Sequence, residues 1–362
     1  MDALMLPLNW QRVRLGDIAN YLTSNLSVEQ ITQQGKIKVY DVNNFIGYTD
    51  TTFISDKPYI SIVKDGSVGR VRILPPKTNI LSTMGALIAN HRTTTEFLFY
   101  LLSNFDFNNF TSGSIIPHIY FKDYKEKTIF LPPLNEQNAI ANILSALDRY
   151  LYALDALILK KEGVKKSLSF ELLSQRKRLK GFNQAWQRVR LGDICEIVKG
   201  QQINKISLNN TDKYPVINGG IDFLGYTNKF NVSKNTIAIS EGGTCGYVRF
   251  MTSNFWSGGH NYSLQKISNK VNNLCLYHIL KSYEKDIMKL GVGSGLKNIQ
   301  LKVLKDFEIP LPPLNEQIAI ANILSDLDNE IASLKNKERQ FENIKKALNH
   351  DLMSAKIRVL EK

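Results

Sequence analysis

Two glycine-flanked turns carry polar side chains suited to binding another molecule. Residues 65–72, Asp-Gly-Ser-Val-Gly-Arg-Val-Arg, correspond to residues 242–249, Gly-Gly-Thr-Cys-Gly-Tyr-Val-Arg. In each, a hydroxyl side chain lies in a glycine turn that leads into a strand carrying Arg72 or Arg249. Exposed backbone N–H groups, a hydroxyl and an arginine suit contact with a phosphate or with the edge of a base. A tight hairpin with solvated arginines has the same pattern and stays an alternative.

A second pair of segments corresponds in the same way. Gly113-Ser114 and Gly293-Ser294 each lie just upstream of a Leu-Pro-Pro-Leu string, at equal spacing, but the polar residues that follow differ. A fixed scaffold with exchanged polar tips is what two different sequence readers need, although drift in a loop produces the same pattern. The candidate binding residues of these segments are Lys64, Ser67, Arg70, Arg72, Ser114, His118, Lys122, Thr244, Tyr247, Arg249, Ser294, Lys297, Asn298 and Lys302.

Patterns that would indicate catalysis or a cofactor are missing. The sequence contains no Gly-x-x-x-x-Gly-Lys-Ser/Thr, no His-Glu-x-x-His, no Gly-x-Ser-x-Gly and no Asn/Asp-Pro-Pro-Tyr of amino-methyl transfer. Its five histidines are not spaced as metal ligands, and Cys195, Cys245 and Cys275 form no Cys-x-x-Cys pair. We therefore predict no catalytic residue, no metal site and no cofactor, and three reduced, partly buried cysteines.

The segments that frame these turns occur twice. Residues 10–18 and 186–194 are the same nonapeptide, and residues 131–148 and 311–328 differ at two of eighteen positions. Fold maintenance requires only the apolar pattern, so identity at positions expected to be exposed indicates that both copies contact the same partner. A recent duplication would leave the same identity. The residues expected to bind that partner are Leu134, Asn135, Glu136, Gln137, Leu314, Asn315, Glu316 and Gln317.

A heptad pattern follows each Pro-Pro pair. Apolar residues from Ile140 to Leu172 recur at steps of four and three, and those from Ile320 to Leu352 repeat this frame 180 residues later. The pattern predicts two helices of about 35–40 residues, each opened by the proline pair. We expect the two apolar seams, which are interrupted by charged residues such as Lys165 and Lys345, to pair antiparallel. Packing of each seam on its own domain is the alternative.

Composition and charge set the class of partner. The 362 residues include 46 Lys and Arg against 33 Asp and Glu, a net charge of +13, which makes a polyanion the first partner to consider. The segment 1–10 carries Asp2 and no apolar run long enough for a signal peptide, and Asp155 interrupts the most apolar stretch. We expect a cytoplasmic protein that does not bind membranes.

The repeated strings resemble a known family. A Trp-x-x-Val-x-Leu-Gly-Asp-Ile head and an Ile-x-Leu-Pro-Pro-Leu-Asn-Glu-Gln tail, each present twice around a divergent insert, are similar to the specificity (S) subunits of type I restriction-modification enzymes. The resemblance implies two target recognition domains, each reading one half of a bipartite double-stranded DNA site. It also implies an antiparallel coiled coil that sets the spacer between the half-sites and docks two modification (methyltransferase) subunits. Restriction subunits would join this assembly.

The resemblance also implies an α+β fold and a division of the chain. Two mixed α/β target recognition domains, in pseudo-twofold arrangement, would be separated by the two long helices. The expected parts are a first recognition domain at 1–133, a central helical region at 134–185, a second recognition domain at 186–313 and a C-terminal helical region at 314–362.

Such a subunit has no catalytic site of its own; the modification subunits would use S-adenosylmethionine to methylate adenine, and the restriction subunits would use ATP. On this reading the candidate binding residues contact DNA, and the repeated Leu-Asn-Glu-Gln helix starts contact the modification subunits. Two alternatives remain: a scaffold that binds only protein, and a solitary DNA-modifying enzyme with an unfamiliar site.

Overall fold

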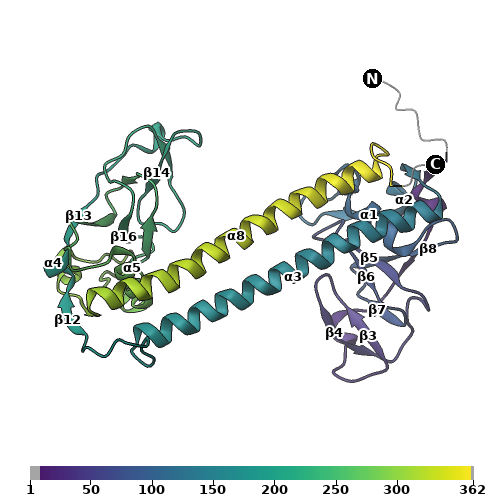
Figure 1. The fold of residues 1–362 in the computed structure, drawn as a ribbon. Helices are drawn as coiled ribbons and strands as arrows, with labels where there is room; N and C mark the ends of the chain where they lie inside the picture. The colour runs from purple at the N-terminus through teal and green to yellow at the C-terminus, as the bar shows by residue number, and fades with distance from the viewer. Residues whose placement is uncertain (1–8, 360–362) are drawn as a thin grey trace. The chain divides into compact units, whose positions relative to one another are not determined.

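The chain folds into two compact units in the computed structural model, which describes residues 9–359. Unit 1 comprises Met1–Asp155 with Asn336–Lys362, and unit 2 comprises Ala156–Lys335. Both divisions fall inside the two longest helices, α3 (Leu134–Leu173) and α8 (Leu314–Met353) (Figure 1). Each unit therefore contains one part of each long helix.

Unit 1 contains a four-stranded antiparallel sheet of order β2-β8-β5-β6 and a three-stranded sheet of order β4-β3-β7. Strand β5 is buried along its whole length, which agrees with four apolar or aromatic residues among its five; the fifth, Ser61, donates a hydrogen bond to the Arg72 carbonyl. The strands and helices of unit 1 other than α3 are β1 (Gln11–Arg14), β2 (Ala19–Thr23), β3 (Ile37–Tyr40), β4 (Phe45–Thr49), β5 (Tyr59–Val63), β6 (Val71–Leu74), β7 (Thr78–Ile80), β8 (Met84–Ala89), α1 (Thr95–Ser103), β9 (Thr111–Ser112), β10 (His118–Ile119), α2 (Phe121–Tyr124) and β11 (Thr128–Leu131).

Unit 2 repeats this topology. Its four-stranded sheet has the order β13-β19-β16-β17, and its three-stranded sheet has the order β15-β14-β18. Its strands and helices other than α8 are β12 (Gln187–Arg190), α4 (Leu191–Ile194), β13 (Glu196–Lys199), β14 (Tyr214–Ile217), β15 (Gly225–Thr227), β16 (Thr236–Ser240), β17 (Val248–Met251), β18 (Trp256–Ser257), β19 (Asn261–Gln265), α5 (Asn273–Ser282), α6 (Glu284–Lys289), α7 (Leu301–Lys305) and β20 (Glu308–Leu311).

The two kinds of repeated string pair with each other. Strand β1 of the head pairs antiparallel with β11 of the tail, and β12 pairs with β20 in the same register. Leu15 and Leu191 of the heads are completely buried. The head and the tail of each unit thus pair with each other at the two ends of the insert. This pairing gives the matched positions a structural reason to be identical in both units.

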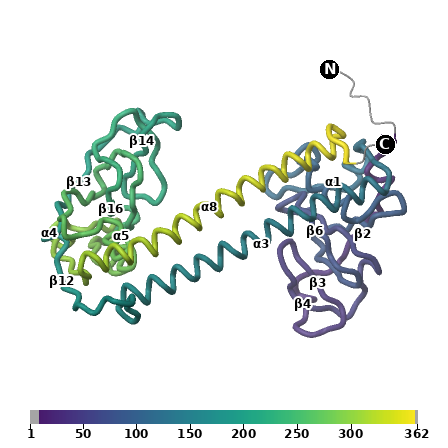
Figure 2. The backbone as a smooth tube through the Cα atoms, viewed as in Figure 1, coloured from purple at the N-terminus to yellow at the C-terminus, as the bar shows by residue number. Residues whose placement is uncertain are grey.

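The long helices pair antiparallel within each unit. Each has 40 residues and begins directly after a Pro-Pro pair, as predicted. In unit 1 Asp148 contacts Lys345, and the rings of Tyr150 and Phe341 lie 4.7 Å apart between centroids. The residue number rises along one helix while it falls along the other, and the backbone trace shows these opposite directions (Figure 2). The predicted antiparallel helix pair is therefore confirmed.

Charged residues that interrupt the heptad seam form ion pairs across it. In unit 2 Lys165 contacts Asp328, which is the Lys345–Asp148 pair of unit 1 displaced by 180 residues. Lys161 Nζ also lies 2.8 Å from Glu330. At Lys161, Lys165 and Lys345 the breaks in the apolar pattern are thus ion pairs between the two long helices. The Lys165–Asp328 and Lys345–Asp148 pairs are equivalent in the two units.

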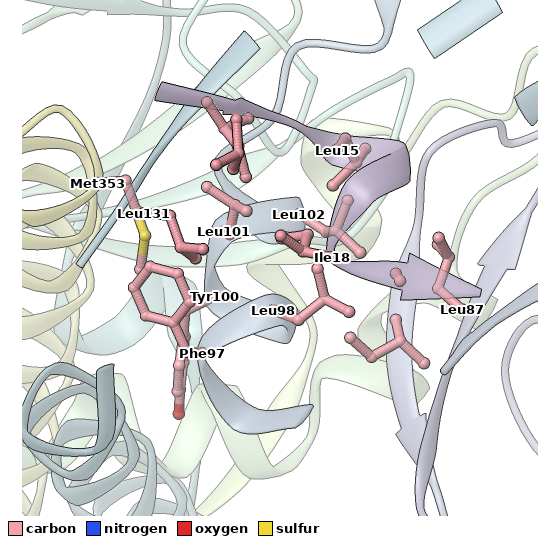
Figure 3. Packing of buried hydrophobic residues seen from close by; sticks show 14 of the residues in the cluster. Leu15, Ile18, Leu87, Phe97, Leu98, Tyr100, Leu101, Leu102, Leu131 and Met353 are labelled. Atoms are coloured by element: carbon pink, nitrogen blue, oxygen red, sulfur yellow. The ribbon is translucent and has the colours of Figure 1, made fainter. Parts of the chain in front are cut away.

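The start of each long helix also packs on the core of its own unit. Ile140 and Leu144 of α3 are completely buried with Phe97 and Leu98 of α1, and Leu352 and Met353 of α8 join the same cluster. Figure 3 shows Met353 beside Tyr100 and Leu131 in this cluster. Ile320 and Leu324 of α8 are buried in the core of unit 2 in the same way. The alternative in which each seam packs on its own domain thus holds for the first turns of both helices and for the last turn of α8, whereas turns between them contact the other helix.

Candidate nucleic-acid interface

Two segments predicted separately as binding loops meet in unit 1. The β5–β6 loop (64–70) and the hairpin between β9 and β10 (113–118) form a pair that we call loop pair 1. The Ile119 N–H donates to the Lys64 carbonyl at 2.9 Å, and the Gly66 N–H donates to the Pro117 carbonyl at 2.9 Å. Between these bonds, His118 Nδ1 lies 2.7 Å from Asp65 Oδ1. The backbone therefore holds the two loops rigidly against each other.

Unit 2 contains the same arrangement, which we call loop pair 2. It consists of the β16–β17 loop (241–247) and residues 292–298. The Ile299 N–H donates to the Glu241 carbonyl at 2.9 Å, just as the Ile119 N–H donates to Lys64. Val292 and Asn298 exchange two backbone hydrogen bonds of 3.0 Å and close the second loop.

Glycines make the sharp backbone path possible at matching positions. Gly69 and Gly246 have φ of 80° and 85°, a region that residues with a side chain rarely adopt. A Cβ at Gly69 would lie 2.6 Å from the ring of Phe107, and one at Gly246 would lie 2.7 Å from the backbone of Met288. The two units thus share the same turn at positions where a residue with a side chain would be strained.

The arginines of the adjoining strands already have partners inside the protein. Arg72 donates to the Asn43 carbonyl at 2.9 Å and stacks over Tyr40, and Arg249 donates to the Ile221 carbonyl. Both therefore tie a loop of the three-stranded sheet to the four-stranded sheet. This is a structural use that the sequence did not reveal, and contact of either arginine with DNA stays a prediction.

The other candidate binding residues differ in accessibility. Tyr247 is half-buried beneath Lys281, whose Nζ lies 4.2 Å from the ring centroid, and Lys122 on α2 lies over the exposed ring of Tyr120. Lys64, His118 and Thr244 are half-buried. The exposed members are Ser67, Arg70, Ser114, Lys122, Ser294, Lys297, Asn298 and Lys302.

Several further residues of the loop pairs are marked by no local sequence pattern. Asp65 holds His118, and the apolar tips Ile115 and Leu296 are 92% and 78% exposed. In unit 2, Glu241 accepts a hydrogen bond of 2.7 Å from Lys199 and one of 3.2 Å from the Tyr262 hydroxyl. These contacts join residues 20 or more positions apart, so no local pattern marked them.

The Glu and Gln of the repeated helix starts are buried, which corrects the expectation that they lie on the surface. Glu136 is 2% exposed and Glu316 is 1% exposed. Glu136 accepts from Trp10 Nε1 at 3.1 Å and from Arg358 Nη2 at 3.0 Å. Glu316 accepts from Trp186 Nε1 at 3.0 Å and from Arg178 Nη2 at 2.7 Å. A buried carboxylate requires such partners, and the tryptophans are the first residues of the repeated heads.

The two glutamines hold the loop before a short helix. Gln137 accepts hydrogen bonds from the Thr93 hydroxyl and the Thr94 backbone N–H, both at 3.0 Å, and donates to two backbone carbonyls. Gln317 accepts from the Asn272 N–H at 2.7 Å. Thr94 and Asn272 are the N-caps of α1 and α5. Internal contacts therefore account for the repetition of Glu and Gln, and a direct role of these side chains in partner binding stays a prediction.

Identical residues that do remain exposed share one end of each long helix. Leu134 and Asn135 of α3 are exposed, as are Leu314 and Asn315 of α8. Two turns further on, Asn142 and Asn322 are exposed as well. In unit 2 a groove of about 860 Å³ opens beside Leu314 and is lined by Val189, Ile194, Pro312 and Pro313. Within residues 9–359, the asparagine side chains of this exposed matched face form no hydrogen bond or ion pair that explains their identity.

Neither a metal-ligand cluster nor a membrane span occurs in the described part of the chain. Within residues 9–359, no three His, Cys, Asp or Glu side chains are grouped as metal ligands. Among the same residues, none of the helices combines the length and apolar character that crossing a membrane requires. All three cysteines are buried and free.

Comparison with known proteins gives a consistent result. The type I restriction modification DNA specificity domain matches the sequence twice, at residues 7–161 and 183–343. A specificity subunit of a type I restriction enzyme from Methanocaldococcus jannaschii is 25% identical over 99% of this chain and 95% of its own length. A Mycoplasma pneumoniae protein, a candidate type I specificity subunit, is 39% identical over 42% of this chain, and the alignment spans 41% of that protein.

Solved structures show the same fold. The crystal structure of the S subunit of a type I restriction-modification system from M. genitalium covers 97% of both chains with a TM-score of 0.74 and 24% sequence identity. A chain from a structure of type I restriction-modification complex assembly gives a TM-score of 0.58 at 19% identity. The chain described here belongs to the family of type I restriction-modification specificity subunits and carries two DNA specificity domains.

Proposed function

We propose that this chain recognises DNA sequence for a type I restriction-modification complex and performs no chemistry itself. Each unit reads one half of a bipartite site in double-stranded DNA through its loop pair. One observation carries this proposal: the two loop pairs share backbone hydrogen bonds and glycine positions but differ in their polar side chains. A constant scaffold with different hydrogen-bonding groups is what recognition of two different half-sites requires.

The net positive charge supports binding to the phosphate backbone. A charge of +13 favours a polyanion, and the exposed Arg70, Lys122, Lys297 and Lys302 lie in or next to the loop pairs. Contacts of this kind position a protein on DNA, whereas sequence is read by groups that reach the base edges. We assign the lysines and Arg70 to phosphate contact and the tips of the loop pairs to base contact.

The paired helices would set the spacer between the half-sites, and the helix starts would dock the modification subunits. The exposed matched face is repeated once in each unit, so it would bind two copies of one subunit. Restriction subunits would join through this assembly. The modification subunits would supply the methyl transfer to adenine, and the restriction subunits would supply ATP-driven translocation and cleavage.

Exchange of one insert tests sequence recognition. Replacing residues 19–130 by the corresponding insert of another specificity subunit should change one half of the methylated motif and leave the other half and the spacer intact. Sequencing of methylated adenines in a host that carries the complete modification complex measures this. An unchanged motif, or a change in both halves, would contradict the assignment of one half-site to each insert.

A charged substitution on the exposed matched face tests partner docking. Asn142→Arg should remove one modification subunit from the assembled complex, and Asn322→Arg should remove the other, each with at least about a tenfold loss of affinity from a buried unpaired charge. The mass of the assembled complex, measured by native mass spectrometry, gives the stoichiometry. Asn343→Arg, at an exposed position of α8 outside the repeated string, is the matched control. Equal effects of all three variants would refute the docking site.

A further inference from the structure

The contact point of the two loops in each pair carries a different set of polar groups. In loop pair 1 this point consists of Asp65 and His118, and in loop pair 2 the corresponding residues are Gly242 and Asn298. The two points share one backbone hydrogen bond, because Ile119 and Ile299 donate to Lys64 and Glu241 at 2.9 Å. The side chains at these corresponding positions differ in chemistry.

In loop pair 1 the carboxylate determines which nitrogen of the ring is available. Asp65 Oδ1 lies 2.7 Å from His118 Nδ1, and both side chains are partly exposed. A carboxylate accepts the Nδ1–H, so the neutral imidazole keeps its lone pair on Nε2. Two flanking backbone bonds, from Gly66 to Pro117 and from Ile119 to Lys64, fix the position of the ring. An oriented, partly exposed acceptor at the contact point of the two loops suits an amino group on a base edge.

In loop pair 2 the absence of a side chain at Gly242 makes room for Asn298. A Cβ at Gly242 would lie 2.2 Å from Asn298 Oδ1, so no side chain fits there while Asn298 keeps its position. Asn298 itself is exposed. A carboxamide offers one acceptor and two donors, the set that pairs with N6 and N7 of adenine in the major groove.

We propose that the residues at 65/118 and 242/298 are two interchangeable sequence-reading pairs. His118, positioned by Asp65, accepts a hydrogen bond from the amino group of cytosine, which presents only a donor in the major groove, and Asn298, accommodated by Gly242, contacts adenine. This inference rests on the proposed function and adds to it the atoms that read one base pair in each half-site. Asp65 is a positioning residue, because it acts through the imidazole and not on the base.

Exchange of the pairs in the full-length chain, assembled with its modification subunits, tests the proposal. Asp65→Gly with His118→Asn should change the preferred base at one position of the first half-site, with discrimination altered by about tenfold or more. Gly242→Asp with Asn298→His should change one position of the second half-site. Sequencing of methylated adenines reports both, since a purely structural defect lowers methylation without changing the motif.

The single variants separate positioning from packing. His118→Asn and Asp65→Ala should relax the same position, because Asp65 acts through His118. Gly242→Asp alone should alter base discrimination at the position read by Asn298, because a Cβ at residue 242 displaces the Asn298 carboxamide, and the added Asn298→His should give the base preference of the Asp–His pair. His91→Asn, the same exchange at an exposed histidine outside the loop pairs, is the control and should leave the motif unchanged.

Two results would overturn the inference. In the first, the methylated motif keeps every base in both double variants while the exchange of residues 19–130 still changes one half-site; recognition by the insert then stands without these pairs. In the second, Asp65→Ala and His118→Asn affect different positions, which would remove the positioning role. An insert exchange that changes nothing would instead refute the proposed function itself.

Discussion

Replacing Arg178 by alanine is expected to destabilise unit 2 by about 3–5 kcal/mol, the typical cost of leaving a buried charge without its partner. Arg178 donates from Nε and Nη2 to the two carboxylate oxygens of Glu316 at 2.8 and 2.7 Å. Glu316 is 1% exposed, and without the guanidinium the indole N–H of Trp186 is the one donor left to it among residues 9–359. Urea denaturation of the complete chain measures the loss.

Two further variants separate the ion pair from general effects of losing an arginine. Arg176 is exposed and lies over the ring of Phe170, so Arg176→Ala should cost less than about 1 kcal/mol. Arg178→Met combined with Glu316→Leu removes both charges and should be less damaging than Arg178→Ala alone. A loss for Arg178→Ala no larger than that for Arg176→Ala would show that Glu316 does not depend on this partner.

Acid is expected to destabilise unit 2 between about pH 6.5 and pH 4 through His278, by about 3 kcal/mol. Burial lowers the pKa of His278 to about 4, outweighing the opposite effect of Asp328. The folded-state pKa therefore lies below the unfolded value of about 6.5. The stabilising contribution is complete above about pH 6.5 and is lost as the pH falls towards 4, because only the unfolded chain takes up the proton in that range.

Unit 1 provides the substitution that tests this effect. Tyr100 occupies the corresponding position of α1 and donates a hydrogen bond of 2.7 Å to Asp148, the counterpart of Asp328. His278 instead lies 3.3 Å from Ser325. His278→Tyr should therefore remove the loss of stability between pH 6.5 and 4 while preserving packing. The urea midpoints of the wild-type protein and of His278→Tyr are measured across this pH range. Carboxylates titrate in both proteins, so the difference between the two pH profiles reports the effect of His278. Parallel profiles would exclude His278 as the cause.

Local pattern predicted the elements around the repeated strings correctly. Arg72 and Arg249, expected in strands that follow glycine turns, lie in β6 and β17, and the two predicted long helices coincide with α3 and α8. Alternation of residue type and heptad spacing are properties of neighbouring residues, so sequence records them directly. The antiparallel direction of the long helices followed from the repeated frame.

Local pattern did not predict whether a repeated polar residue is buried or exposed. Glu136 and Gln137 are polar and were expected outside, yet Trp10, Arg358 and the N-cap of α1 draw them into the interior. These partners lie more than 40 residues away along the chain. Sequence identity between the two repeated strings therefore reflects internal contacts as well as any external partner.

The sequence by itself determined the duplication, the long helices and the family, because identity and periodicity are visible along a single chain. Only the tertiary structure decided that the β5–β6 loop and the β9–β10 hairpin meet, that Asp65 orients His118, and that Gly242 leaves room for Asn298. Such contacts join residues more than 50 positions apart in the chain, which only the tertiary fold brings together. Their geometry arises from backbone hydrogen bonding across the fold and not from the local order of residues.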